Sequence, residues 1–498
     1  MLNLRLEGSH SGLVRPPAKR VGGDELPRGF ESRSLRQFCP PTPWTHPRRI
    51  WLIGDTRIVR YHIWTEGCQM NKADSERMGS GLEQLGLEWA DTAREADVIV
   101  LNTCVVRQSA EDRAVGMLTS LKPWKESFPD KTLAVMGCMV GPQKTQLQKR
   151  YPYVDVFMQP QQFEPLLARV GDTLGIDPDG CVTDLVPGHP KVTTHVPIIH
   201  GCDKFCTFCI IPYRRGRQVS RPLNELVEEC RTLASRGVVE VTLLGQTVDA
   251  YGDDLPGSPD LADLLEAIHE GVPEIARIRF LTSHPSDMSQ RIIDAVAHLP
   301  RVMESVNLPF QAGNDDVLAN MKRGYTNAEY RELVSRIRTT VPGVAMITDL
   351  IVGFPGETES QFEDSLAMVR EMRFDKVHVA VYSTRPNTIA DRKMTDDVPL
   401  EEKQRRFHAI EAAQEAVLTE INNTYLGTTQ EVLVDGRNRG RWRGRSRTDK
   451  LVFFEPPDGM ETDLLGRIVD VKITKTTPWS LQGAARAMTL DPLTTAER

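Results

Sequence analysis

Three cysteines lie close together in the segment GCDKFCTFCIIPYRRGR, where Cys202, Cys206 and Cys209 have the spacing CxxxCxxC. A structural zinc site needs four ligands, and no fourth cysteine or histidine follows at a suitable spacing. Three thiolates on one compact loop can instead hold three irons of a cubane iron–sulfur cluster and leave the fourth iron without a protein ligand. The spacing therefore predicts a cluster whose open iron can bind a substrate and pass an electron to it.

Three further cysteines each follow a short apolar run: Cys68 follows RIVRYHIWTEG, Cys104 follows DVIVLNT, and Cys138 follows TLAVMG. Helical sequence separates the runs, as between Asn71 and Leu85, and this alternation is typical of a parallel sheet covered on both faces. The carboxyl ends of parallel strands meet at one edge of a sheet, where binding sites form. For any one of these cysteines, a small buried side chain is a common alternative. Their shared position favours three thiols that converge.

The CxxxCxxC loop follows the first of six further candidate strands, which alternate with amphipathic helices such as PLNELVEECRTLASRG. Repeated strand–helix units predict an α/β barrel or part of one, with the chemistry on loops at the carboxyl ends of the strands. Cys230 lies within the first of these helices, where we expect it to pack. The candidate strands are THVPIIHG, VVEVTLLG, RIRFLTS, SVNLP, AMITDLIVG and KVHVAVYS.

Length and composition indicate the class of protein that surrounds these sites. The chain has 498 residues, 40% of them apolar and 26% charged, which is ordinary for a globular protein of several domains. No apolar run approaches the roughly 18 residues that span a membrane, and the first residues lack the apolar core of a secretory signal, so we expect a cytoplasmic location. Nine cysteines without such a signal indicate reduced thiols rather than disulfides.

Two stretches are expected to carry no site. Residues 1–57 are rich in Pro, Gly and Arg and lack a helical or strand period, so we expect a disordered extension, or a start codon placed too far upstream. Cys39, within this stretch, is expected to bind nothing. Residues 177–190 read DPDGCVTDLVPGHP, and their turn residues indicate a linker in which Cys181 is incidental.

Positive charge gathers near the end of the chain, although the formal net charge is −7. Residues 437–447 read RNRGRWRGRSR, with arginine at every odd position and no acid. In one strand, period-2 alternation would place all six guanidinium groups on one face, a surface suited to a phosphate backbone; a solvated charged loop is the alternative. The tract falls between the first two strands of a predicted small all-β barrel, which favours a hairpin.

The cysteine spacing after the first barrel strand resembles that of radical S-adenosylmethionine (SAM) enzymes. In that family, the amino and carboxylate groups of SAM chelate the open iron, and the electron delivered cleaves the sulfonium to a 5′-deoxyadenosyl radical. The resemblance implies a SAM cradle at later strand ends, which include Leu244 in LLGQ and the motif VGFPGE with Pro355 and Glu357. The residues that it implies for SAM binding are Gly245, Gln246, Asn307, Gln311, Gly313, Gly353 and Gly356.

The arrangement as a whole resembles the methylthiotransferases. This implies an α/β protein with three ordered parts: an N-terminal parallel-sheet domain at 58–176, a radical SAM core with a partial (β/α)6 barrel at 188–421, and a small antiparallel RNA-binding β-barrel of the TRAM type at 424–488.

The same resemblance gives the N-terminal cysteines a role. In that family an N-terminal trio of cysteines holds an auxiliary 4Fe–4S cluster with one iron free, and the corresponding residues here are Cys68, Cys104 and Cys138. The enzyme would then carry two 4Fe–4S clusters. One SAM methylates sulfur on the auxiliary cluster, and a second yields the radical that opens a C–H bond, so that C–H becomes C–S–CH3.

The motifs TEGCQMNKADSERM, LLGQTVDAYG, LTSHPSDM and NMKRGYT resemble the branch of the family that acts on tRNA. Its substrate is N6-isopentenyladenosine at position 37, next to the anticodon, which is methylthiolated at C2. Thr247 and Asp249 replace asparagines expected there, and GCMVG departs from the pattern beyond Cys138. The alternatives are the branches that modify threonylcarbamoyl-adenosine in tRNA or an aspartate of a ribosomal protein. A non-catalytic iron–sulfur protein that binds RNA is a different class.

The resemblance also implies partners: the tRNA anticodon loop, a sulfur donor, and an electron donor such as flavodoxin or ferredoxin. Holding phosphates and unstacked bases suits arginine and aromatic side chains. Arg214, Arg215 and Arg217 follow the cluster loop and could line the mouth of the barrel, with a solvated surface as the alternative. For Trp442, the alternative to stacking on a base is packing within the hairpin. The residues expected to bind RNA are Arg441, Trp442, Arg443 and Arg445.

Overall fold

The computed structural model describes residues 58–182, 184–456 and 463–487. The predicted disordered extension at 1–57, Cys39 and the side chain of Cys181 therefore lie outside the described residues. The chain forms two compact units. The first contains the described residues up to His189 together with Tyr213–Arg215, and the second contains Pro190–Pro212 and the described residues from Gly216 onward.

The first unit is built on a parallel sheet, which in the described residues has five strands in the order β2-β1-β3-β4-β5. The strands are β1 (Arg60–Thr65), β2 (Glu88–Trp89), β3 (Val98–Thr103), β4 (Thr132–Gly137) and β5 (Val156–Met158). The helices are α1 (Gln69–Gln84), α2 (Gln108–Ser120), α3 (Lys122–Ser127), α4 (Thr145–Arg150), α5 (Glu164–Leu174) and α6 (Pro178–Cys181).

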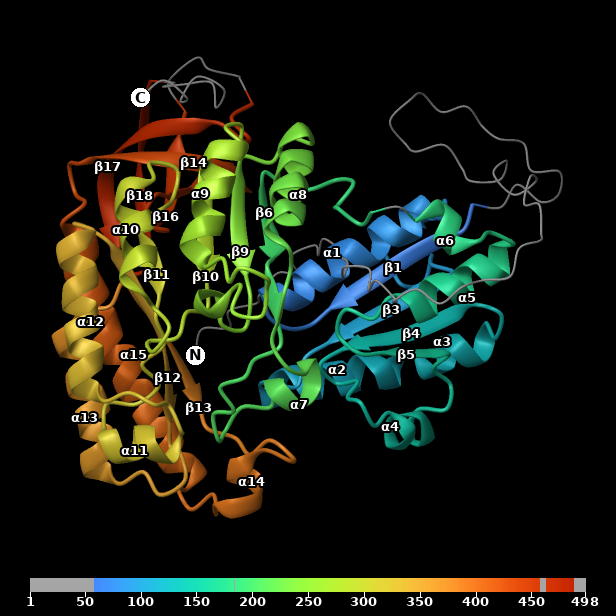
Figure 1. The fold of residues 1–498 in the computed structure, drawn as a ribbon, viewed down its shortest axis with the longest axis horizontal. Coiled ribbons are helices and arrows are strands. Elements are labelled where there is room, and N and C mark those ends of the chain that lie inside the picture. Colours follow the sequence, from blue (N-terminus) through green and yellow to red (C-terminus); the bar gives the residue numbers. More distant parts are fainter. Residues whose placement is uncertain (1–57, 183, 457–462, 488–498) are drawn as a thin grey trace. The chain divides into compact units, whose positions relative to one another are not determined.

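Alternate residues of the central strand β3 face opposite sides of this sheet and enter two separate cores. Val98 and Val100 pack with apolar side chains of α1 and α5, whereas Ile99 and Leu101 pack with Leu118 of α2. The helices accordingly cover both faces (Figure 1). This explains why the strand sequences are continuous apolar runs rather than alternating ones.

The stretch predicted as a linker is held against α1 instead of forming a simple connection. Asp177 caps the short helix α6 by accepting a hydrogen bond from the backbone of Asp179. Further along, Ser80 Oγ of α1 donates to the Val186 carbonyl at 3.1 Å, and Leu185 is buried in the core on that face. Turn residues alone did not reveal this packing, because it depends on one apolar side chain and on contacts distant in sequence.

The second unit begins with parallel strands that correspond to all six candidates of the sequence. They form two three-stranded sheets, β10-β9-β6 and β11-β12-β13, and a parallel bridge between Ile278 and Val302 links the edges of the two. The strands are β6 (Thr193–Pro197), β9 (Glu240–Leu244), β10 (Arg277–Leu281), β11 (Ser305–Asn307), β12 (Ala345–Val352) and β13 (Lys376–Val381). The described residues thus contain a partial barrel of six parallel strands, as predicted.

Helices connect these strands, and a small antiparallel pair of β7 (Ile199–His200) and β8 (Val219–Ser220) flanks the cysteine loop. The connecting helices are α7 (Ile211–Arg215), α8 (Leu223–Ser235), the 3-10 helix η1 (Val248–Ala250), α9 (Leu261–Gly271), α10 (Gln290–His298), α11 (Asp315–Asn320), α12 (Asn327–Thr340), α13 (Glu359–Met372), α14 (Ile389–Lys393) and α15 (Leu400–Asn423). Within the described ranges, every helix is too short or too polar to cross a lipid bilayer.

A closed β-barrel follows α15, with the strand order β14-β15-β16-β18-β17 in the part of the chain described. Neighbouring strands are antiparallel except β16 and β18, which are parallel, so the prediction of an antiparallel barrel was wrong for that one pair. The parallel pair arises because β17 crosses the barrel before β18 returns beside β16. The strands are β14 (Thr429–Asn438), β15 (Arg441–Ser446), β16 (Leu451–Glu455), β17 (Ile468–Thr477) and β18 (Ser480–Ala487).

The β-barrel lies at the amino-terminal ends of the core strands (Figure 1). Buried arginines of β10 fix it there. Arg277, which is fully buried, donates to the Arg445 carbonyl at 2.7 Å and pairs with Glu431 at 2.8 Å. Arg279 donates to the carbonyls of Ser446 and Arg447 at 2.7 and 2.9 Å. The barrel therefore lies at the edge of the core sheets opposite to the loops that follow the strands.

Candidate active site

The cysteines of the first unit follow three neighbouring strands at their carboxyl ends. Cys68 comes shortly after β1, Cys104 directly after β3 and Cys138 directly after β4, and these strands are adjacent in the sheet. Burial and, after it, the nearby Cys138 and Cys68 raise the pKa of the Cys104 thiol to about 12. The structure thus places the three cysteines at one edge of the sheet, and their joint role as cluster ligands stays a prediction.

A buried amide network fixes the relative positions of the loops that carry these cysteines. Asn71, at the start of α1, donates to the Asn102 side chain at 2.8 Å and to the Thr103 carbonyl at 3.1 Å. Cys68 Sγ lies 3.4 Å from Asn71 Oδ1. Gly137, with φ of 94°, precedes Cys138, and a Cβ there would lie 2.4 Å from the Thr103 carbonyl oxygen. Glycine is therefore required where β3 and β4 end side by side.

The cysteines of the second unit lie on the loop after β6 and β7. Cys206 is buried, and Arg323 Nη1 donates to its sulfur at 3.3 Å. Cys202 Sγ lies 3.4 Å from the hydroxyl of Thr247, which follows β9. Burial raises the pKa of Cys209 to about 12, with Cys206 as the next contribution. Three thiols again share one small region at the carboxyl edge of parallel strands.

The donor chemistry of both groups of cysteines fits an iron–sulfur cluster, because thiolates are the usual protein ligands of such clusters. Among the described residues, no three side chains of His, Cys, Asp or Glu converge closely enough to hold one metal ion. A cubane cluster makes no such demand, because each thiolate binds a different iron. The buried arginine at Cys206 also suits a negatively charged cluster, since it supplies a positive charge and a donor beside the sulfur.

Two of the residues predicted to bind SAM present unused acceptors. The Oε1 atoms of Gln246, after β9, and Gln311, after β11, are buried and lack a hydrogen-bond partner among the described residues. A buried acceptor without a donor is costly, so both amides fit a ligand that brings N–H or O–H groups, such as SAM. The backbone of Gln311 has φ of 67°, a conformation that is uncommon for residues other than glycine.

Asn307, by contrast, is occupied by contacts within the protein. Its Oδ1 accepts from the Thr282 amide at 3.2 Å, and its Nδ2 donates to Asp349 at 3.3 Å. Gly245 and Gly313 have packing roles, since a Cβ would lie 2.3 Å from Ile199 and 2.4 Å from the Ser365 backbone, respectively. A role for these three in binding SAM stays a prediction.

The motif VGFPGE forms a turn in which both glycines have positive φ, 71° at Gly353 and 79° at Gly356. The Gly353 amide donates to Glu357 at 2.6 Å, and the Gly356 amide donates to Asp397 at 2.7 Å. Glu357 is itself buried and paired with Arg406 at 2.9 Å. The turn is thus held by carboxylates, and its contact with the adenine of SAM stays a prediction.

A second set of unused polar atoms lies on the loops after β9 and β10. Asp249 Oδ2 accepts from the His284 amide at 3.0 Å, while Asp249 Oδ1 and His284 Nε2 are buried without a hydrogen-bond partner in the part of the chain described. Burial raises the pKa of Asp249 to about 7 and lowers the pKa of His284 to about 2. Asp249 stands where an asparagine was expected, so the site gains a carboxyl that titrates near neutrality.

The arginines after the cysteine loop differ in their environments. Arg217 is exposed and paired with Asp203 of the loop at 2.7 Å. Arg214 and Arg215 belong to the first unit. Arg215 is buried and pairs with Asp74 at 2.8 Å, so the expectation that it lines the mouth of the barrel was wrong. The sequence could not show this, because Asp74 lies far away in the chain and an arginine-rich loop end gives no sign of burial.

The arginine tract forms a hairpin, as predicted, with β14 ending at Asn438 and β15 beginning at Arg441. Trp442 is 4% exposed and packs in the core of the β-barrel, with the guanidinium carbon of Arg437 3.8 Å from its ring centroid. Its predicted role as a stacking platform for a base is therefore wrong. Side chains alternate along β15, so the arginines point outward and Trp442 points inward. Which set faces inward depends on the register of β15 with its neighbouring strands and not on composition.

Half of the tract's positive charge is already paired within the protein. Arg443 pairs with Asp435 at 2.8 Å, Arg445 with Asp449 at 3.8 Å, and Arg447 with Glu304 at 2.6 Å. Arg441 instead donates to Gln482 at 3.2 Å, a neutral partner. Arg437, Arg439 and Arg441 have no carboxylate partner among the described residues, so the charge available to a ligand lies toward the turn.

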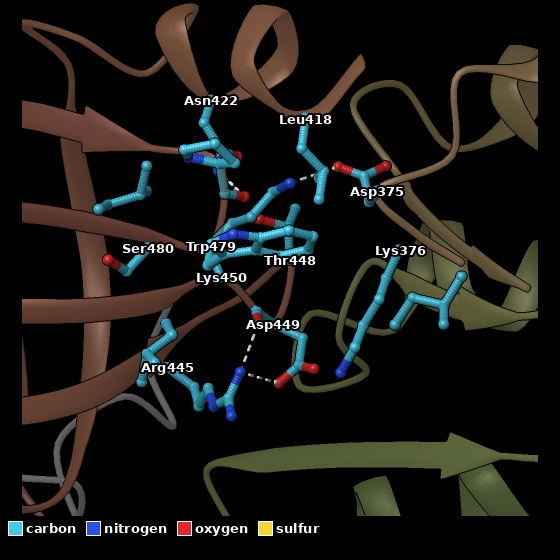
Figure 2. A pocket seen from close by; sticks show the side chains of 14 residues that line it. Asp375, Lys376, Leu418, Asn422, Arg445, Thr448, Asp449, Lys450, Trp479 and Ser480 are labelled. Carbon is cyan, nitrogen blue, oxygen red and sulfur yellow. Dashed lines mark hydrogen bonds and ion pairs between the residues drawn. The ribbon is translucent and has the colours of Figure 1, made fainter. Parts of the chain in front are cut away.

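Figure 2 shows a pocket between the β-barrel and the first residues of β12 and β13. Arg445, Lys376 and Asp449 line it together with Trp479, a residue that is 60% exposed. Trp479 lies in the turn between β17 and β18, which Asn422 holds by donating to the backbone carbonyls of Thr477 and Pro478. Trp479 is thus an exposed tryptophan of the barrel, and no pattern in the sequence had indicated it as a binding residue.

Known protein families match each part of the chain. Residues 60–159 match a family described as "Uncharacterized protein family UPF0004", residues 196–369 match the Radical SAM superfamily, and residues 423–485 match the TRAM domain. The second match agrees with the partial barrel and its cysteine loop. The chain is therefore a radical SAM protein, with SAM and a 4Fe–4S cluster as cofactors.

Curated relatives identify the branch. A tRNA-2-methylthio-N(6)-dimethylallyladenosine synthase of Roseiflexus sp. (strain RS-1) is 48% identical over 86% of this chain and 90% of its own length. Synthases of the same name from Herpetosiphon aurantiacus and Chloroflexus aurantiacus are 47% and 46% identical over 85% and 86% of this chain and 97% and 91% of their own lengths. The chain belongs to this methylthiotransferase family.

Proposed function

We propose that the protein is a tRNA methylthiotransferase that replaces hydrogen by a methylthio group at C2 of N6-isopentenyladenosine, at position 37 next to the anticodon. The observation that carries this function is the presence of two separate groups of three thiols, each at the carboxyl edge of parallel strands. The names of relatives 46–48% identical support the substrate. No observation favours threonylcarbamoyl-adenosine, a ribosomal-protein aspartate or a non-catalytic role.

Each group of cysteines is proposed to hold one 4Fe–4S cluster with one iron open. When bound, these cofactors together with SAM supply a carbon-centred radical and the sulfur atom that is transferred. Cys202, Cys206 and Cys209 are the ligands in the second unit, and Cys68, Cys104 and Cys138 are those in the first. Gln246 and Gln311 orient SAM by accepting hydrogen bonds at their unpaired oxygens.

The β-barrel is proposed to hold the anticodon loop through Arg441, Arg443 and Arg445, which face outward on β15. Arg441 is expected to contribute most, because carboxylates already partner Arg443 and Arg445. With Trp442 buried, stacking on a base is assigned to the exposed Trp479. A flavodoxin or ferredoxin is the proposed electron donor, and a separate partner supplies the sulfur, in the cytoplasm where tRNA is modified.

The two groups of thiols can be separated by mutation. The parent, reconstituted anaerobically, should hold about eight irons, and a Cys104→Ala variant about four. This variant should still cleave SAM under reduction, because SAM cleavage requires only the cluster at Cys202, Cys206 and Cys209. It should transfer no sulfur, because the cluster that supplies the sulfur is lost.

Cys230→Ala is the matched control, since this cysteine is buried in α8 outside both groups. It should retain both the irons and the transfer of sulfur. Full methylthiolation by Cys104→Ala would refute the role of the first group of cysteines. A parent protein that binds only about four irons would refute the presence of two clusters.

A further inference from the structure

Arg215 is a buried charge next to the cysteines of the first unit. Its side chain is 2% exposed, and Nη2 donates to Asp74 Oδ2 at 2.8 Å. Asp74 is completely buried on α1, the helix that begins directly after Cys68. The guanidinium is therefore held in one position inside the protein rather than free in solvent.

The surroundings of Arg215 couple it to sulfur as well as to Asp74. Burial raises the pKa of Cys138, and the charge of Arg215 is the strongest influence in the opposite direction. Burial opposes the positive charge of Arg215, whereas Cys138, Asp74 and Cys68 all raise its pKa. The guanidinium therefore lies near both the Asp74 carboxylate and the cysteines of the N-terminal trio.

One nitrogen of this guanidinium is unused. Nη1 of Arg215 is buried and has no hydrogen-bond partner among the described residues. Leaving a buried charged donor unpaired is costly, so buried donors in proteins seldom remain without a partner. A sulfur atom of a cluster held by the neighbouring cysteines would be an acceptor for it.

The second unit shows the same pairing of a buried arginine with a cysteine. Arg323 is buried and donates to Cys206 Sγ at 3.3 Å. Hydrogen bonds to sulfur and nearby charge are two of the factors that set the reduction potential of an iron–sulfur cluster. Adding an electron makes a cluster more negative, so a fixed cation beside it favours the reduced form.

We propose that Arg215 is a positioning residue of the auxiliary cluster, which donates Nη1–H to one of its sulfur atoms and raises its reduction potential. The role rests on the proposed second cluster. The electron concerned comes from the external reductant and enters the cluster, so the oxidised and reduced forms differ by one electron. Asp74 keeps the guanidinium in place for this contact.

The test measures the midpoint potential of the auxiliary cluster by a redox titration followed by electron paramagnetic resonance. The parent carries Ala at Cys202, Cys206 and Cys209, so that only one cluster contributes to the signal. Arg215→Met should keep about four irons and shift the midpoint potential to more negative values, because both the cation and the donor are lost. Arg215→Lys, which keeps the charge without the fork of donors, should give a smaller negative shift.

Two further variants control for the loss of charge and for misfolding. Arg169→Met removes an arginine of the same unit that is 44% exposed and paired with Asp155, and it should leave the potential unchanged. In Arg215→Met/Asp74→Asn, no buried carboxylate is left unpaired, so the fold is kept while the donor to sulfur is still absent. This double variant should also show a negative shift.

Full iron content at the parental potential in Arg215→Met or in the double variant would overturn the proposal, and so would an equal shift in Arg169→Met. A parent that takes up no iron would instead overturn the auxiliary cluster itself, and the role of Arg215 with it. Because this result appears before any arginine is changed, the two failures are distinguishable.

Discussion

Buried side chains around the cysteines contribute charge as well as hydrogen bonds. Arg323 at Cys206 and Arg215 near Cys138 place a cation beside one thiol of each group. Asp249 adds a carboxyl whose pKa burial raises to about 7. These charges matter because electrostatic interactions are strong where water is excluded.

Asp249 makes stability depend on pH. Its pKa is 3.8 in an unperturbed chain and about 7 in the folded protein, so the folded state holds the proton more tightly, and stability is lost as pH rises from about 4 to about 7. Asp249→Asn cannot ionise. Its melting temperature relative to the parent should therefore increase between about pH 4 and pH 7. A difference that does not change with pH would contradict the raised pKa.

The two tryptophans of the β-barrel should respond differently to truncation. Trp442→Ala should lower the free energy of unfolding by about 3–5 kcal/mol, because it empties a site in the barrel core. Trp479→Ala should change stability by less than about 0.5 kcal/mol. It should weaken tRNA binding about tenfold, as expected when one stacked base is lost. Chemical denaturation and filter binding distinguish these outcomes, and unchanged tRNA affinity in Trp479→Ala would exclude the stacking role.

Among single residues, the sequence indicated the six cysteines as candidate cluster ligands, but it did not indicate the arginines that lie near them. The six thiols stand out because their spacing and their place after apolar runs are local patterns. Arg215 and Asp74 are 141 residues apart, and nothing near either residue indicates that they pair. Trp442 shows the same limit, since the direction of its side chain depends on the register of β15 with its neighbours.

The hairpin of β14 and β15 is the element that organises positive charge. Its turn consists of Arg439 and Gly440, both with positive φ, which matches the twist of a tight two-residue hairpin. Beyond the turn, carboxylates partner Arg443 and Arg445, so the two ends of the hairpin differ in available charge.

This difference predicts unequal effects on RNA binding. Arg441→Ala should weaken tRNA binding more than Arg443→Ala does, and it should reduce the salt dependence of binding by about one counterion. Arg443→Ala should have little effect on the slope, because Asp435 already neutralises that charge. Affinities measured across a range of salt concentrations would show this, whereas equal slopes for the two variants would contradict the pairing seen in the structure.

At the element scale, the strands of both α/β sheets were predictable because each is a short apolar run between helices. The parallel pair β16–β18 was not, since topology in a small barrel is decided by a chain crossing that leaves no local pattern. The segment 177–190 similarly has the composition of a linker, yet Leu185 inserts into the core of the first unit.

Within the second unit, buried arginines join the β-barrel to the radical SAM core. Arg277 is the largest fully buried side chain among the described residues, and both of its contacts reach strands of the barrel. A polar junction of this kind fixes the orientation of the β-barrel on the radical SAM core. Each guanidinium donates in fixed directions, so its carbonyl partners must stand in one arrangement.

Arg277→Ala should therefore destabilise the second unit by about 3–5 kcal/mol, since it leaves the Arg445 carbonyl and Glu431 without their partner. It should also make the connection between α15 and β14 accessible to proteases. Arg336→Ala, which changes an exposed residue of α12, serves as the control and should be within about 0.5 kcal/mol of the parent. Equal stability of the two variants would contradict the anchoring role.

At the scale of the whole molecule, the three predicted parts are arranged in two compact units, with the β-barrel joined to the core. The sequence indicated each part by its own pattern. It could not indicate that Arg277 and Arg279 bury their charges against the barrel, because arginine in a strand ordinarily faces solvent.

Insertion of a methylthio group into isopentenylated tRNA is tested by nucleoside mass spectrometry of tRNA from cells lacking this protein. N6-isopentenyladenosine should accumulate without its methylthio form, and the parent chain should restore the methylthio form while Cys104→Ala should not. Persistence of the methylthio nucleoside in these cells, or its restoration by Cys104→Ala, would exclude this function.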